Sequence, residues 1–163
     1  MKMSDLLQKK SVLKVKNFLK DNLPRTELII LENTARSAKD AANALGKNVG
    51  AIVKSLSFKD SKNNFYLCLV SGDKYLSYDK LSNIIKDKVI KANAEEVKGQ
   101  TGFSIGGVSP FVHLNNPKKT FIDDNLNKYE TIYAAAGHPH VVFGIKFKDI
   151  VELSEGNIED IVE

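Results

Sequence analysis

Apolar and polar residues alternate along the chain with two periods, that of a helix and that of a strand. The helical period is clearest near the N-terminus. Between residues 5 and 22, apolar residues recur at helical spacing while lysines fill the opposite face, which predicts an amphipathic helix limited by Pro24. A second helix is predicted from Ser37 to Gly46, because Ser37 and Asp40 resemble a capping box and glycine favours a C-terminal stop.

Strand-like segments dominate the rest of the chain. Runs of β-branched, aromatic and aliphatic residues predict strands at residues 27–32, 51–58, 65–72, 88–92, 119–123, 131–136 and 141–147. The polar turn at 59–64 joins two of them in a hairpin. Further helices are predicted around 78–86 and 93–99, before a tail that ends in a helix or a strand. This order predicts an α/β fold in one domain, residues 1–163, with helices packed on a mixed sheet.

Composition is that of an ordinary globular protein. The 163 residues are 42% hydrophobic and 27% charged, which suits one domain with a real core. No apolar run approaches the roughly 18 to 20 residues that span a bilayer, and the N-terminus lacks the apolar centre of a secretory signal. We therefore expect a cytoplasmic protein without a membrane partner. The single cysteine, Cys68, agrees with a reducing compartment.

The net charge of +4 hides an uneven distribution. Residues 1–60 carry 12 basic and 6 acidic side chains, whereas residues 149–163 carry 6 acidic and no basic ones. A basic front favours a polyanionic partner such as nucleic acid, although a well-solvated lysine-rich surface explains the same charges. Charge alone therefore indicates a class of partner without naming it.

One lysine occupies the apolar phase of a predicted strand. In the segment 51–58, Lys54 shares a face with Ile52, Leu56 and Phe58. The ammonium group can extend to water at the sheet edge, or it can open into a cleft and bind an anion. The strand pattern leaves both interpretations open.

The segment TGFSIGGVSPFVH, residues 101–113, combines glycines with apolar residues. Gly106 and Gly107 permit backbone conformations closed to other residues, and Ser109 before Pro110 is biased toward an extended shape. Successive N–H groups can then bind a carboxylate, a phosphate or a developing oxyanion, or the segment can be a plain connecting loop. It lacks the motifs of a P-loop and of a dinucleotide-binding turn.

Other reactive side chains give weaker patterns. Cys68 alternates with leucines in an apolar strand, which is typical of a buried structural thiol. His113, His138 and His140 can in principle share a metal ion, but no carboxylate or cysteine lies at ligand spacing, and we predict no metal site. Asp123 is placed to cap the next helix.

Six segments occur in a recognisable order. They read TARSAKDAANALG, IVKSLSF, LVSGDKYLSYDKL, ANAEEVKGQTGFSIGGVSPF, FIDDNL and IYAAAGHPHVVF. Together they closely resemble the YbaK and EbsC family, also described as the prolyl-tRNA synthetase-associated editing domain. The resemblance covers about residues 25–155 and implies a compact α/β domain with a mixed, partly barrel-like sheet flanked by helices.

The resemblance implies a free-standing aminoacyl-tRNA deacylase that hydrolyses the ester of mischarged tRNA in translational proofreading. The implied substrate is tRNA for proline that carries cysteine, alanine or another small amino acid, and prolyl-tRNA synthetase is a further implied partner. The ester is already activated, so hydrolysis needs positioning, an oriented water and stabilised charge rather than a catalytic triad or a cofactor. The ribose hydroxyl or a substrate thiol can assist in place of water alone.

The resemblance also implies the site residues. The implied catalytic residues are Lys54, Gly106, Gly107 and Ser109. The implied substrate-binding residues are Lys54, Ser55, Gly72, Asp73, Gly102, Val108, Pro110, Gly137 and His138. We hypothesise that Lys54 engages the terminal adenosine or its phosphate while N–H groups of residues 106–109 hold the acyl carbonyl. At Val112 many relatives have glycine, and we expect the amino-acid preference to differ there.

Two other functions fit the same residues. A non-catalytic module that binds tRNA, a nucleotide or a synthetase would share the basic surface and the loop but show no turnover. A hydrolase of another small ester would need neither tRNA nor a basic face. Turnover of a panel of esters separates the three.

Overall fold

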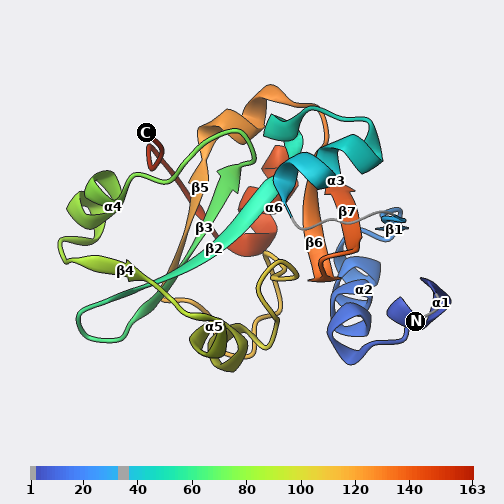
Figure 1. Ribbon diagram of the computed structural model, residues 1–163, viewed down its shortest axis with the longest axis horizontal. Coiled ribbons are helices and arrows are strands. Elements are labelled where there is room, and N and C mark those ends of the chain that lie inside the picture. Colours follow the sequence, from blue (N-terminus) through green and yellow to red (C-terminus); the bar gives the residue numbers. More distant parts are fainter. Residues whose placement is uncertain (1–2, 33–36) are drawn as a thin grey trace.

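The computed structural model describes residues 3–32 and 37–163, whose strands form two sheets (Figure 1). The strands are β1 (Leu28–Ile30), β2 (Val53–Asp60), β3 (Phe65–Ser71), β4 (Val89–Lys91), β5 (Lys119–Asp123), β6 (Ile132–His138), β7 (Val141–Ile145) and β8 (Asn157–Glu159). The first sheet has the order β1-β7-β6 and the second the order β4-β2-β3-β5-β8. Residues 34–36, which begin the first family-like segment, lie outside the described residues.

The described helices are α1 (Met3–Leu6), α2 (Lys10–Asn22), α3 (Ala38–Leu45), α4 (Tyr78–Ile85), α5 (Ala94–Thr101), α6 (Phe147–Ser154) and the 3₁₀ helices η1 (Val49–Ala51) and η2 (Asp124–Lys128). Four of the described helices, α3, α4, α5 and η2, begin at a residue whose side chain caps them. The Ser37 hydroxyl accepts the Asp40 N–H at 3.1 Å, and Gly46 ends α3 in the left-handed conformation, which confirms both predictions. Asp123 caps η2, also as predicted.

Two helix boundaries differ from the prediction. The single helix expected over residues 5–22 is broken between α1 and α2, and nothing in the sequence of residues 7–9 marks the break. The helix expected to end near Gly99 continues to Thr101, because Gly102 supplies the left-handed cap with a φ of 82°. The tail forms both of the alternatives considered, helix α6 and then strand β8.

The second sheet mixes both pairing directions. Strands β2 and β3 form the predicted antiparallel hairpin, whereas β5 runs parallel to β3 and β8 parallel to β5. Strand β4 pairs with β2 only at Phe58, Lys59 and Asp60. The remainder of that β2 edge, residues 53–57, therefore has no paired strand in the described part of the chain, apart from the bridge between Ile52 and Tyr133 at its start.

Apolar side chains fill both sides of the second sheet. On one side, buried residues of α2 and the first sheet pack with Val53, Leu67 and Leu69. On the other side, Cys68 and Val70 pack with α4 and the C-terminal segment. Burial raises the pKa of the Cys68 thiol to about 12, so this cysteine is a protonated core residue, as its strand pattern predicts.

The predicted fold class is confirmed, since helices flank mixed β-structure in a compact α/β arrangement. The strands form two open sheets joined by the bridge between Ile52 and Tyr133, without closing into a complete barrel. The segment at residues 102–113, called here the glycine loop, lies between α5 and the end of β6 (Figure 1). Among the described helices, none has the length and apolar character needed to cross a membrane.

Candidate functional site

A cavity of about 340 Å³ runs along residues 52–57, the part of β2 that does not pair with β4. We call it the Lys54 cavity. Its walls come from β2, the start of α3, the segment from β4 to α5, and the glycine loop. Of the site residues implied by the resemblance, the cavity brings together Lys54, Ser55, Gly106 and Val108.

The open edge of β2 gives this cavity polar backbone groups. Strand β4 pairs with β2 only from Phe58 onward, so residues 54–56 have no strand partner on this edge in the described part of the chain, and an unpaired strand edge presents N–H and C=O groups. An aminoacyl group carries an amine and a carbonyl, and both can hydrogen-bond to such an edge. The cavity can therefore orient this kind of ligand with main-chain groups alone.

Lys54 is half-buried, and its ammonium group is engaged within the protein. It donates a hydrogen bond to the backbone carbonyl of Lys74 and lies 5.1 Å from the centre of the Tyr75 ring. Burial lowers the pKa of Lys54, while the negative charges of Asp73 and Asp123 oppose that shift. Lys54 lines a cavity, as one of the two interpretations expects, but its ammonium group is bound to the turn after β3; binding of an anion stays a prediction.

Ser55 has an unusual environment. Its hydroxyl is buried and has no hydrogen-bond partner among residues 3–32 and 37–163. An unsatisfied buried polar group costs about 1–3 kcal/mol. Because Ser55 lines the cavity, a bound ligand can supply the missing partner.

Gly106 and Gly107 have different roles in the glycine loop. Gly106 has a φ of 89° and lines the cavity, as does Val108. The Gly107 N–H instead donates to the Ser104 carbonyl at 2.9 Å, and a Cβ on Gly107 would lie 2.9 Å from the backbone N of His138. Gly107 therefore allows close packing of the loop on β6, while the two residues that flank it, Gly106 and Val108, line the cavity.

Ser109 lies outside the cavity lining and is fully buried. Its hydroxyl accepts the Phe111 N–H at 3.0 Å, and its carbonyl oxygen lies 2.6 Å from Nε2 of His113. These contacts stabilise the turn at Pro110. The predicted catalytic role of Ser109 stays a prediction, and the geometry gives its side chain a structural role.

Gly72 and Asp73 form the turn after β3 next to Lys54, but neither lines the cavity. A Cβ on Gly72 would clash with the Val49 carbonyl, so the glycine allows η1 to approach. Oδ1 of Asp73 accepts a hydrogen bond from the Ser71 hydroxyl at 3.1 Å. The expected contribution of Asp73 is thus electrostatic, through Lys54.

Gly137 and His138 lie behind the glycine loop. Gly137 has a φ of 91° and packs against the Ser11 carbonyl at the start of α2. Nδ1 of His138 accepts the His140 N–H at 3.0 Å, and burial lowers the pKa of His138, with smaller contributions from His140 and Lys9. The two residues support the loop at Gly107, and their predicted contact with substrate stays a prediction.

The sequence did not single out three residues of this region. Lys91 and Ile105 line the cavity, and the Tyr75 ring lies beside the Lys54 ammonium group. In the sequence, Lys91 precedes an alanine and Ile105 precedes a glycine. Neither pattern indicates a site without the tertiary fold. Within the described ranges, no group of three or more His, Cys, Asp or Glu side chains is arranged to hold a metal ion.

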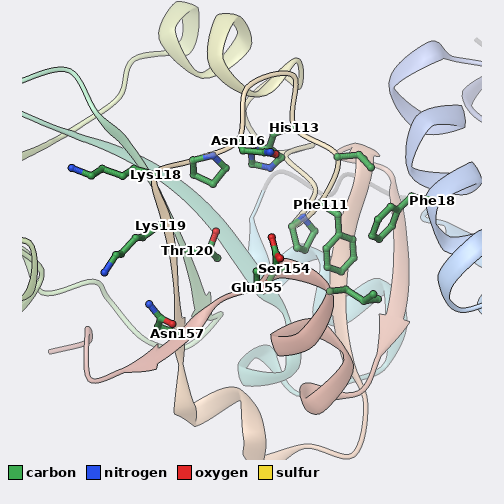
Figure 2. Close-up of a pocket in the computed structure, with 14 residues that line it drawn as sticks. Phe18, Phe111, His113, Asn116, Lys118, Lys119, Thr120, Ser154, Glu155 and Asn157 are labelled. Atoms are coloured by element: carbon green, nitrogen blue, oxygen red, sulfur yellow. The ribbon is translucent and has the colours of Figure 1, made fainter.

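A second, larger cavity of about 540 Å³ lies on the other part of the glycine loop (Figure 2). We call it the Phe111 cavity. Pro110 and Phe111 line it, together with Phe18 of α2, and Lys118 and Lys119 lie at its edge with side chains that extend away from the aromatic rings (Figure 2). The predicted substrate-binding residue Pro110 thus faces this cavity, while Gly102 caps α5.

Val112 also lines the Phe111 cavity and has a φ of 54°. A β-branched residue rarely adopts this left-handed conformation, which explains in physical terms why glycine suits the position. Val112 does not line the Lys54 cavity, so the geometry gives no support to the prediction that it sets the amino-acid preference.

Comparisons with known proteins agree on one family. Residues 32–153 match the family described as "Aminoacyl-tRNA editing domain". The chain is 28% identical over 123 residues to "Uncharacterized protein YwhH" of Bacillus subtilis, covering 76% of this chain and 78% of that protein. It is 24% identical over 126 residues to "Putative Cys-tRNA(Pro)/Cys-tRNA(Cys) deacylase EbsC" of Enterococcus faecalis, covering 77% of this chain and 76% of that protein.

A solved structure shows the same fold. The crystal structure of "a putative trans-editing enzyme for prolyl tRNA synthetase" superimposes with a TM-score of 0.88 and 34% sequence identity, covering 95% of this chain and 98% of that one. The family match extends from the start of the Lys54 cavity region through the glycine loop and β6. The chain therefore belongs to the aminoacyl-tRNA editing domain family.

Proposed function

We propose that this chain is a free-standing deacylase that hydrolyses the ester of mischarged tRNA, and that the substrate is tRNA for proline carrying a small amino acid such as cysteine or alanine. The observation that carries the proposal is the meeting of Lys54, Ser55 and the Gly106 backbone in one cavity. Family membership supports the ester class, and the EbsC and trans-editing relatives support the tRNA class.

Each part of the cavity has a role in this proposal. The Lys54 ammonium group binds the ribose or phosphate of the terminal nucleotide, where a positive charge is most useful. The N–H groups of Gly106 and Val108 hold the ester carbonyl and stabilise the negative charge that develops on its oxygen. The Ser55 hydroxyl hydrogen-bonds to the aminoacyl group and thereby gains the partner that it lacks.

The reaction needs no covalent intermediate with the protein. Water adds to the ester carbonyl carbon, the bond between that carbon and the ribose oxygen then breaks, and the ribose oxygen leaves with the proton that the water gives up. The products are the free amino acid and uncharged tRNA. Since the substrate ester is activated, alignment of water and carbonyl accounts for most of the expected rate enhancement.

The cavity size supports a small amino acid. Its volume of about 340 Å³ is at the low end of the range of about 300–1,000 Å³ for ligand pockets, and Ile52, Val97 and Ile105 make it apolar. An apolar pocket discriminates one methylene by only about 1–3 kcal/mol, so exclusion of larger side chains is the means of selection.

A panel of mischarged tRNAs, with free aminoacyl esters as controls, tests the proposal. We expect turnover of at least one tRNA carrying a small amino acid, and loss of turnover in folded Lys54→Ala and Gly106→Ala variants. Wild-type turnover by both variants, or hydrolysis of free esters alone, would contradict it.

The same panel tests a non-catalytic binding module. The hydrogen bond from Lys54 to the Lys74 carbonyl favours this second candidate, because it gives the lysine a structural role that requires no chemistry. Binding of tRNA that weakens with rising salt, with no turnover of any ester, is the expected outcome for such a module.

A further inference from the structure

Tyr75 exposes a large aromatic ring beside the Lys54 cavity. Its exposed fraction is 73%, the largest among the exposed large hydrophobic residues of the described chain. Tyr78 is also exposed, but its ring packs edge-on against Phe58 at a centroid distance of 5.6 Å. Tyr75 has no such aromatic neighbour among the described residues, so its ring contributes little to the core.

The backbone under this ring is firmly held. The Tyr75 carbonyl accepts the Glu163 N–H at 2.9 Å, the next residue, Leu76, bridges to Val162, and the Lys74 carbonyl accepts the Lys54 ammonium group. An exposed side chain on a fixed backbone loses less conformational entropy when it binds a ligand than one on a loose loop. The Tyr75 ring is therefore an exposed binding surface on a backbone whose position is already fixed.

Lys54 is the residue that the ring and the cavity share as a neighbour. Lys54 lines the cavity and also lies over one face of the Tyr75 ring, at 5.1 Å from its centre. With one face next to the cation and 73% of the residue exposed, the ring is open to solvent on its remaining surface. Tyr75 does not itself line the cavity, but its ring lies next to a residue that does.

We propose that Tyr75 stacks on the 3′-terminal base of the acceptor strand and thereby positions the aminoacyl ester in the Lys54 cavity. This inference rests on the proposed function. The cavity of about 340 Å³ suits the aminoacyl group and its ribose, and it leaves the attached base outside, next to Lys54. Single-stranded nucleic acid binds through aromatic rings on which bases stack, together with cations that meet the backbone. Tyr75 and Lys54 supply one of each.

The exposed ring is better suited to a base than to the side chain of a protein partner. It is a single aromatic residue beside a lysine, and the described chain places no second exposed aromatic residue in contact with it. Protein interfaces instead surround their aromatic anchors with a wider apolar patch. A base needs only one π-face and a neighbouring cation.

Steady-state deacylation with two substrates tests the proposal. One mischarged tRNA ends in adenosine, and the other carries an abasic ribose at the same position. With the adenosine substrate, Tyr75→Ala and Tyr75→Leu should raise KM and lower kcat/KM by about five- to thirty-fold, whereas Tyr75→Phe, which keeps the ring, should stay within about two-fold. With the abasic substrate, the alanine and phenylalanine variants should not differ.

Leu114→Ala is the matched control, because Leu114 is also an exposed apolar residue, at 65%, and lies outside the Lys54 cavity lining. Its kcat/KM should stay within about two-fold of wild type with both substrates. If Tyr75→Ala also stays within two-fold, or if its loss is equally large with the abasic substrate, the stacking proposal is wrong while the proposed deacylase function stands.

A binding measurement tests the inference without catalysis. An uncharged single strand that ends in CCA, with 2-aminopurine in place of the terminal adenine, loses fluorescence when the base stacks. Wild type and Tyr75→Phe should quench it with similar affinity, and Tyr75→Ala should weaken binding by about five-fold or more. Equal quenching by the alanine variant contradicts the inference, whereas normal quenching by a protein that hydrolyses no ester contradicts the deacylase function alone.

Discussion

The two cavities on the glycine loop differ in size and in chemistry. The larger cavity has fewer groups suited to binding the proposed substrate, and the smaller cavity has more. The Phe111 cavity is larger, about 540 Å³ against about 340 Å³, but its lysines point away from its aromatic side (Figure 2). The Lys54 cavity combines a half-buried ammonium group, an unsatisfied hydroxyl on Ser55 and an open strand edge. The chemistry of the smaller cavity, rather than its volume, therefore supports it as the proposed site.

The loop itself divides between the two. Its first part, with Gly106 and Val108, borders the Lys54 cavity, whereas its second part, with Pro110 and Val112, borders the Phe111 cavity. Gly107 lies between these parts and packs on His138. Substitutions on either side of Gly107 should consequently affect different properties of the protein.

Removal of one lysine side chain from each cavity should give the largest difference in deacylation activity between two variants. We expect Lys54→Ala to lower kcat/KM for a mischarged tRNA by about ten- to 100-fold, because it removes a charged hydrogen bond to the terminal nucleotide, worth about 1.5–3 kcal/mol. Lys119→Ala, at the edge of the Phe111 cavity, should change it by less than about two-fold. Deacylation kinetics with thermal unfolding of both variants measure this. A loss of activity in Lys54→Ala that only follows unfolding would assign the lysine a structural role.

The close packing of Gly107 gives the second prediction. Gly107→Ala places a Cβ 2.9 Å from backbone atoms of His138, so we expect a loss of about 1–3 kcal/mol in the free energy of unfolding and at least a ten-fold loss of activity. Gly99→Ala in α5, where nothing lies within 4 Å, should instead add about 0.5–1 kcal/mol. Denaturant unfolding checks both values. Equal stabilities would show that the loop moves away from β6 at no cost.

The pH dependence of the deacylation rate gives the third prediction. If the Lys54 ammonium group acts in hydrolysis, the rate should fall as pH rises through its pKa, which burial places below the usual value of 10.5. Asp73→Asn removes a charge that raises this pKa and should move the fall to lower pH. Glu155→Gln, at the Phe111 cavity, should leave the profile unchanged. The measurement is the deacylation rate as a function of pH, corrected for uncatalysed hydrolysis. If Asp73→Asn does not shift this pH profile, the ammonium group of Lys54 has no role in the reaction.

The same pKa shift fixes the sign of a stability effect. Between the lowered pKa of folded Lys54 and 10.5, the unfolded chain binds more protons than the folded one. The contribution of this group to stability should therefore rise with pH across that window.

Val112 gives the smallest predicted effect. Val112→Gly relieves a left-handed β-branched residue, worth about 1–2 kcal/mol, but it adds flexibility to the unfolded chain, worth about 0.5–1 kcal/mol, and removes apolar contacts. We expect a net change below about 1 kcal/mol and no change in the order of preferred amino acids. A reordered preference in the substrate panel would connect the Phe111 cavity to the site.

The sequence predicts local features of the site well. Helix α3 with its Ser37 cap, the β2–β3 hairpin and the position of Lys54 in an apolar strand all follow from patterns within about ten residues. The family resemblance adds Gly106 and Val108, and the structure places them beside Lys54 in one cavity.

Features that depend on distant pairing were not predictable in this way. The open edge of β2 exists because β4 stops short, which is set by contacts between residues about thirty positions apart. The burial of Ser109 and the approach of Tyr75 to Lys54 likewise arise only when the glycine loop and the C-terminal segment are in place. The resemblance implies a catalytic role for Ser109, whereas its hydrogen bonds give its side chain a structural role, and the catalytic role stays a prediction.

A titration with a non-hydrolysable substrate analogue shows directly which of the two cavities binds the aminoacyl end of the substrate. The ligand is adenosine that carries alanine through an amide at the 3′ position, added to ¹⁵N-labelled protein and followed by NMR. Binding in the Lys54 cavity should give the largest chemical-shift changes at the backbone amides of Ser55, Gly106 and Val108. Changes confined to Thr120, Ser154 and Asn157, which line the Phe111 cavity, would contradict it.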